Sequence, residues 1–200
     1  MTHWMQRRAL LGGALLAAPL LARPANAWQL FPTAAPLPDV PLLDQARRPW
    51  RFRSQALAQR PAVAIELIYA GCSSICPIST RVMAEARTAL GAQGAAVRCL
   101  SLTLDPEADT PERLAAYAEA AGAAGAAEAG DWLFLTGTRG DMRSLLRALR
   151  ARFGHPDDHA PVFFVGDGAT PRLRQLFAIP PPDELAAAML SAVPAGARPG

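Results

Sequence analysis

The chain has 200 residues, 51% of them hydrophobic, so it is long enough for one domain with a proper core and too short to argue for two. Arg7, Arg8 and Arg23 lie in the first 27 residues, which contain no acidic residue; removing these three from the 20 basic residues leaves 17, equal to the 17 acidic residues. A neutral remainder gives no reason to expect nucleic-acid binding, which needs a clustered basic face.

The N-terminus has the three parts of an export signal. Arg7 and Arg8 are followed by an apolar run to Ala22 and then by Ala25-Asn26-Ala27, a small-x-small cleavage pattern. We therefore expect a signal peptide over residues 1–27, of the twin-arginine or the ordinary secretory type, and a periplasmic protein. The apolar run is short for a bilayer of about 30 Å, which disfavours an uncleaved membrane anchor.

The first half of the mature chain predicts an extended segment, a hairpin, a strand and a helix. Residues 28–40 are proline-dotted and fit an extended tether, and residues 41–52 fit a hairpin. Residues 61–69 form a buried-type strand, in which Glu66 needs a polar partner or an edge position. Residues 77–90 predict a helix opened by Pro77 and capped by Cys76.

The second half predicts three further helices and four strands in one domain, residues 41–194, with a tail over 195–200. Cys99 falls inside the strand 97–104, where we interpret it as a small buried hydrophobe. The remaining elements are a helix 111–121 capped by Thr110 or Asp109, a low-complexity loop 122–130, a strand 132–136, a helix 140–153 with its arginines in solvent, a polar loop 154–161, strands 162–165 and 173–177, and a helix 182–193. This order predicts an α/β fold of thioredoxin-like type, a central mixed sheet flanked by helices.

Two cysteines follow the strand 61–69 with the spacing C-x-x-x-C-P. Cys72 and Cys76 would lie together beside a positive helix end, which lowers a thiol pKa and favours the thiolate that binds metal or attacks disulfides. A structural disulfide that closes a small loop is the simpler interpretation of the spacing alone. The junction of a strand end and a helix start is, however, where active-site loops of α/β folds lie.

A histidine in the polar loop provides a third candidate ligand. In a thioredoxin-like sheet the loop before the last hairpin lies against the cysteine loop, which would bring His159 within reach of the thiols. Two thiolates and one imidazole suit Cu(I), and the imidazole also tolerates Cu(II). His155 is the alternative ligand in the same loop.

Four motifs in order resemble the Sco/SenC family of copper chaperones: CSSICP at Cys72–Pro77, LTLDPEADTP at Leu102–Pro111, DWLFLTG at Asp131–Gly137 and DHAPVFFVGDG at Asp158–Gly168. The resemblance implies a thioredoxin-like fold and copper bound by Cys72, Cys76 and His159, with Asp105 supporting the site from behind the ligands. It also implies a role in assembling the CuA centre of cytochrome c oxidase, with oxidase subunit II as the partner.

Two departures keep other functions open. The residues before Cys72 are Tyr-Ala-Gly, where the family often has Tyr-Thr-x, and no proline follows Cys72. The client would then be another copper enzyme, or the protein would be a thiol-disulfide oxidoreductase in which Cys72 attacks, Cys76 resolves and a thioredoxin-type protein is the reductant. A peroxidase of the same fold is a weaker alternative, because such sites usually have a single activated cysteine and no ligand histidine.

Overall fold

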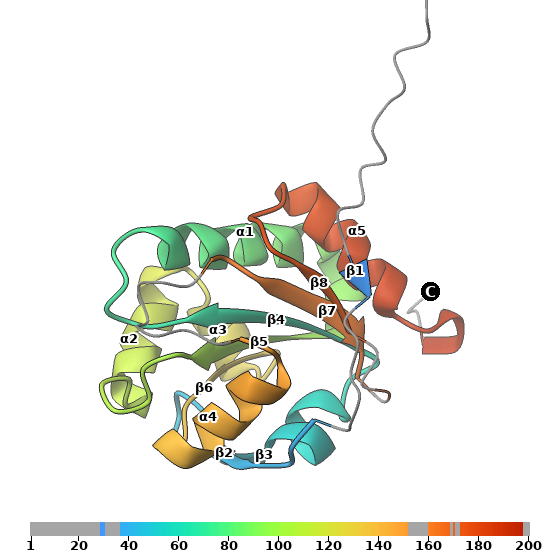
Figure 1. Cartoon of the computed structure of the whole chain (residues 1–200). Helices are drawn as coiled ribbons and strands as arrows, with labels where there is room; N and C mark the ends of the chain where they lie inside the picture. Colours follow the sequence, from blue (N-terminus) through green and yellow to red (C-terminus); the bar gives the residue numbers. More distant parts are fainter. Residues whose placement is uncertain (1–28, 31–36, 152–159, 169, 171–172, 198–200) are drawn as a thin grey trace, which may run out of the picture.

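The computed structural model describes residues 29–30, 37–151, 160–168, 170 and 173–197. Its centre is a six-stranded sheet in the order β1-β8-β7-β4-β5-β6 (Figure 1). The strands are Gln29–Leu30 (β1), Ala62–Ile68 (β4), Val97–Thr103 (β5), Trp132–Leu135 (β6), Phe163–Asp167 (β7) and Leu173–Leu176 (β8). β4, β5 and β6 are parallel, whereas β7 is antiparallel to β4, β8 to β7 and β1 to β8. The predicted central mixed sheet is confirmed.

Helices cover both faces of this sheet, because successive side chains of a strand point to opposite faces (Figure 1). In β4, Ala64 and Ile68 join one core cluster, and Ile65 and Leu67 join the other. The first cluster packs under α1 (Ile75–Leu90), α2 (Pro111–Ala120), α3 (Ala124–Glu128) and α5 (Pro182–Ala192). The second packs under α4 (Arg139–Ala148) and the π-helix η1 (Phe52–Leu57). Short 3₁₀ helices, η2 (Gly91–Ala96) and η4 (Ala195–Ala197), follow α1 and α5.

The predicted hairpin near the start of the domain is confirmed as β2 (Pro41–Leu43) paired with β3 (Pro49–Arg51). Asp44 organises its turn: one carboxylate oxygen accepts the backbone N–H groups of Ala46 and Arg48, at 2.8 and 2.9 Å. The other oxygen accepts from the Arg48 side chain at 2.7 Å and from the Trp50 indole at 3.0 Å. A bridge between Leu43 and Thr136 joins the hairpin to the end of β6.

Three elements differ from the sequence prediction. The low-complexity segment predicted as a loop contains the helix α3, since alanine has the highest intrinsic helix propensity. The helix predicted over 140–153 ends at Ala148, because Arg150 adopts a positive φ of 56° and the N–H of Ala151 bonds back to the carbonyl of Leu146 at 2.8 Å. The segment predicted as a tether contributes strand β1 and the buried side chain of Leu37.

The export signal predicted over residues 1–27 lies outside the described residues. Within the part of the chain that the structure describes, no helix combines the length and hydropathy needed to cross a bilayer.

Candidate functional site: a dithiol at the β4–α1 junction

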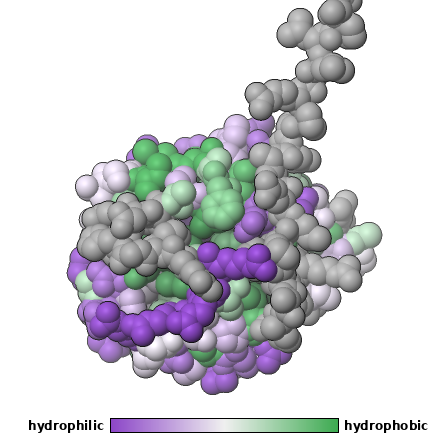
Figure 2. Space-filling model, in the orientation of Figure 1, coloured by the Kyte–Doolittle hydropathy of each residue, from purple (hydrophilic) through white to green (hydrophobic). Residues whose placement is uncertain are grey.

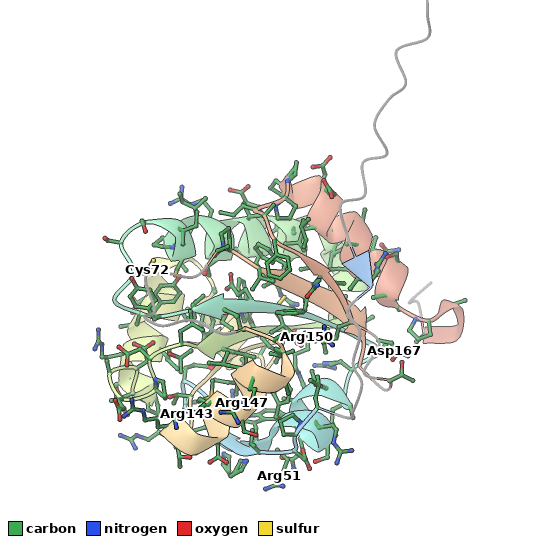
Figure 3. All side chains as sticks on the ribbon, in the orientation of Figure 1. Arg51, Cys72, Arg143, Arg147, Arg150 and Asp167 are labelled. Carbon is green, nitrogen blue, oxygen red and sulfur yellow. The ribbon has the colours of Figure 1, made fainter. Side chains whose placement is uncertain are left out.

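Cys72 lies in the short connection between the end of β4 and the start of α1, far from Arg143 and Arg147 on α4 (Figure 3). The N–H of Cys72 donates to the carbonyl of Tyr69 at 3.1 Å, so residues 69–72 form a tight turn that leaves the sheet. The predicted placement of the cysteine loop, between a buried strand and a helix, is confirmed.

The start of α1 differs from the prediction by two residues. The helix begins at Ile75, so Cys76 is in its first turn rather than at the cap, and Pro77 is the third helical residue. Proline is tolerated there because the first four N–H groups of a helix have no acceptor within the helix. The N–H of Cys76 instead donates to the sulfur of Cys72, with N and Sγ 3.4 Å apart. The Cys72 sulfur therefore does what a capping oxygen does in most helices.

The two reduced cysteines have different environments. Cys72 is 7% exposed and its sulfur also lies 3.8 Å from the Ser74 hydroxyl, whereas Cys76 is fully buried. Burial by itself would raise the pKa of Cys72, but hydrogen bonds from Cys76 and Ser74 outweigh it and leave that pKa below its ordinary value. Burial, with the nearby Cys72 sulfur, raises the pKa of Cys76. Of the two thiols, Cys72 thus has the lower pKa and the greater exposure.

A buried carboxylate lies on the α1 side of β4. Oε1 of Glu66 accepts from Ser101 at 2.7 Å and from Thr80 at 3.0 Å, and Oε2 is buried with no hydrogen-bond partner among the described residues. Further hydrogen bonds join Thr80 to the Tyr117 hydroxyl at 2.9 Å and the Trp132 indole to Ser101 at 2.9 Å. Burial raises the pKa of Glu66 to about 7. Glu66 therefore has the polar partners that a buried carboxylate needs, the hydroxyl groups of Thr80 and Ser101.

The loop between β5 and α2 reaches the cysteine loop through Asp109. Oδ2 of this buried residue accepts the N–H of Ala70 at 3.0 Å and the hydroxyl of Thr103 at 2.5 Å. The side chain of Asp105 accepts from Ala108 at 3.3 Å, within its own loop. The helix cap that the sequence left open between Asp109 and Thr110 is Thr110, whose side chain accepts from the Arg113 N–H. The signal in the sequence that could have pointed to Asp109 is its position in the same motif as Asp105, four residues later.

The candidate ligands His159 and His155 lie outside the described residues. Within the described residues, no group of three His, Cys, Asp or Glu side chains is arranged to hold a metal ion. Ala160 is three residues before Phe163, which begins β7 and pairs with Glu66 of β4. Because β7 is antiparallel to β4, the chain enters β7 from the edge of the sheet at which β4 delivers Cys72.

Two large, exposed hydrophobic side chains lie near this edge. Ile78, two residues after Cys76, is 53% exposed, and Phe177, directly after β8, is 61% exposed. Leu176 of β8 pairs with Phe163, so Phe177 leaves the sheet at the same edge as the cysteine loop. Figure 2 shows hydrophobic surface around α1 and β8 and mainly hydrophilic surface on the side of α4. Exposed apolar residues beside a pair of thiols are typical of protein contact surfaces.

The third cysteine is separate from the pair. Cys99 lies in the middle of β5, is fully buried and pairs in register with Ala64 and Trp132. Its complete burial confirms the interpretation as a small core residue, and this burial raises the pKa of Cys99 to about 12.

A mixed sheet with a dithiol between a central strand and the following helix defines a protein of thioredoxin-like architecture. The family model for SCO1/SenC matches residues 45–186, so this chain belongs to the SCO1/SenC family. A search of curated proteins found no match.

Solved structures of similar fold include Bradyrhizobium japonicum ScoI with copper bound, at 21% identity and a TM-score of 0.62, covering 79% of this chain and 99% of that one. Yeast Sco1 with copper bound gives 22% identity and a TM-score of 0.61, with 82% and 99% covered. BsSco, described with a disulfide switch and as a member of a family of cytochrome c oxidase assembly proteins, gives 23% identity and a TM-score of 0.64, with 78% and 94% covered. These likenesses confirm the thioredoxin-like Sco fold.

Proposed function

We propose that this protein is an exported copper chaperone that holds copper through Cys72, Cys76 and His159 and transfers it to a copper protein in the periplasm. The observation that carries the proposal is the pair of reduced cysteines held together at the start of α1. Thiolates favour Cu(I), and a third, imidazole ligand would complete a low-coordination site that also accepts Cu(II). Family membership, and copper in two solved structures of the same fold, support this assignment.

The receiving protein in this proposal is subunit II of cytochrome c oxidase, at its CuA centre, or another copper enzyme. A chaperone must release its metal, so its ligands have to be accessible to the ligands of a partner. Cys72 is 7% exposed and Cys76 is fully buried, so Cys72 is the thiol that a partner's ligand would reach first. The apolar side chains of Ile78 and Phe177 provide a surface against which a partner can pack.

Copper titration of the reduced protein tests the proposal. We expect one Cu(I) per chain in competition with a chelator of known affinity, and a sulfur-to-copper charge-transfer band with Cu(II). His159→Ala should weaken binding by roughly tenfold or more, while His155→Ala serves as the matched control from the same loop. Unchanged affinity in His159→Ala would remove this histidine from the site, and loss in His155→Ala alone would assign the ligand to His155.

The inequivalence of the thiols favours a second function, reduction of a disulfide in the copper-site target. The Cys72 thiolate would attack one target sulfur and release the other as a thiolate; Cys76, after losing its proton, would then attack Cys72 and free the second target thiol. The chain would be left with a Cys72–Cys76 disulfide, which a thioredoxin-type reductant would have to reduce. Equilibration with glutathione tests this: a disulfide that resists reduction by glutathione would indicate a structural bridge.

A further inference from the structure

The carboxylate of Asp109 joins three segments of the chain behind the cysteine loop. Asp109 is 1% exposed, and the same oxygen, Oδ2, accepts the N–H of Ala70 and the hydroxyl of Thr103. The oxygen of Thr103 in turn accepts the N–H of Asp105 at 3.0 Å. A single buried group therefore connects the turn after β4, the end of β5 and the loop before α2.

The bond to Ala70 acts at the corner of the turn that presents Cys72. In this turn the carbonyl of Tyr69 accepts the N–H of Cys72, and Ala70 and Gly71 are its two central residues. The N–H of the first central residue of such a turn has no acceptor within the turn, and a half-buried N–H without a partner is costly. Asp109 supplies the acceptor, and bonds to a carboxylate are stronger than bonds to a neutral oxygen.

The position of this turn decides where the Cys72 sulfur lies. The sulfur must stay within reach of the Cys76 N–H, 3.4 Å away, for the two thiols to remain together at the helix start. If the turn moved away from β5, Cys72 would move with it, whereas Cys76 is fixed in the first turn of α1.

We propose that Asp109 is a positioning residue of the dithiol site: its carboxylate holds the Tyr69–Cys72 turn against β5, so that the Cys72 sulfur stays beside Cys76 in the arrangement that copper binding requires. The inference rests on the proposed function for its copper readout. The part that concerns geometry, in which Asp109 fixes the position of Cys72, applies equally if the site carries out thiol-disulfide exchange.

Glu107 provides a matched control. It belongs to the same loop and has the same charge, but its carboxylate accepts from the Arg139 side chain at 3.2 Å in an exposed ion pair. A general effect of negative charge near the site would be removed by Glu107→Ala as well as by Asp109→Ala. An effect of the bond to Ala70 would be removed only by Asp109→Ala.

The experiment compares Asp109→Ala, Asp109→Asn and Glu107→Ala by Cu(I) affinity and by hydrogen exchange of the Ala70 amide in the reduced protein. We expect Asp109→Ala to lose roughly tenfold or more in affinity and to exchange the Ala70 amide faster. Asp109→Asn should restore most of the affinity, because its amide oxygen can accept the same two hydrogen bonds without the charge. Glu107→Ala should stay within about twofold of the wild type in both readouts.

A folded Asp109→Ala protein with wild-type affinity and a protected Ala70 amide would overturn the proposal, as would an equal loss in Glu107→Ala. If Asp109→Ala does not fold, hydrogen exchange in the wild-type protein tests the proposal. An Ala70 amide that exchanges as fast as an exposed loop amide would contradict the hydrogen bond from Ala70 to Asp109. If the wild type binds no Cu(I), the proposed function fails, while Ala70 exchange and the alkylation rate of Cys72 still test the role of Asp109.

Discussion

The backbone N–H of Cys76 and the sulfur of Cys72 form a hydrogen bond across the start of α1. The sulfur accepts a hydrogen bond from an N–H that has no acceptor within the helix. The positive end of the helix also stabilises negative charge on that sulfur. Cys72 is 7% exposed and Cys76 is fully buried, and the bond lowers the pKa of Cys72, so the two joined thiols are chemically different.

This difference predicts the order in which the cysteines react. In the reduced protein at about neutral pH, iodoacetamide should modify Cys72 first, because the thiolate is the nucleophile and the pKa of Cys72 is lowered. Cys76 and Cys99 are fully buried and have raised pKa values, so they should react only after unfolding. Mass spectrometry of timed samples measures the order. Cys72→Ser should leave the native protein almost unreactive; rapid modification of Cys76 in that variant would contradict the assignment.

A second prediction concerns the pH dependence of stability. The pKa of Glu66 is raised from 4.5 to about 7, so the folded state binds this proton more tightly than the unfolded state does. The stabilisation is complete below pH 4.5, falls as the pH rises to about 7, and is constant above that. Its size is on the order of 3 kcal/mol. Urea unfolding of wild type and Glu66→Gln across this range isolates it, because the glutamine accepts the same hydrogen bonds but does not titrate. A parallel pH profile for the two proteins would show that Glu66 does not titrate in this window.

Local features of the sequence predicted the strand, the loop and the helix that carry the cysteines. They did not predict the hydrogen bonds that hold these parts together. Apolar runs and the Cys-x-x-x-Cys-Pro spacing placed the strand, the loop and the helix correctly, since these depend on neighbouring residues. The start of α1 was misplaced because the acceptor for the Cys76 N–H is a sulfur four residues earlier, which lies outside the usual capping patterns. The partners of Glu66, Thr80 and Ser101, lie 14 and 35 positions away, and only the packing of α1 on the parallel strands brings them together.

The hairpin offers a third prediction, on stability away from the thiols. Asp44 is fully buried and accepts four hydrogen bonds from the turn and from Trp50. Asp44→Ala would leave these donors without their acceptor, so we expect a loss of about 3 kcal/mol in the free energy of unfolding. Glu107, in an exposed ion pair with Arg139, is the control, and Glu107→Ala should cost less than about 1 kcal/mol. Chemical denaturation measures both; similar small losses would mean that the turn does not depend on Asp44.

The fourth prediction compares two glycines by adding one methyl group to each. A Cβ at Gly168, in the last sequence motif, would meet the backbone oxygens of Arg60 and Leu57 at 2.2 and 2.4 Å, distances that only a backbone shift can relieve. Gly125, in α3, would meet nothing within 4 Å and has an ordinary helical backbone. Gly168→Ala should therefore destabilise the protein by about 2 kcal/mol or more, while Gly125→Ala should stabilise it by up to about 1 kcal/mol. Thermal unfolding of the two variants gives the comparison, with opposite signs expected. A wild-type melting temperature for Gly168→Ala would show that β7 and the chain between η1 and β4 do not approach as closely as the structure has them.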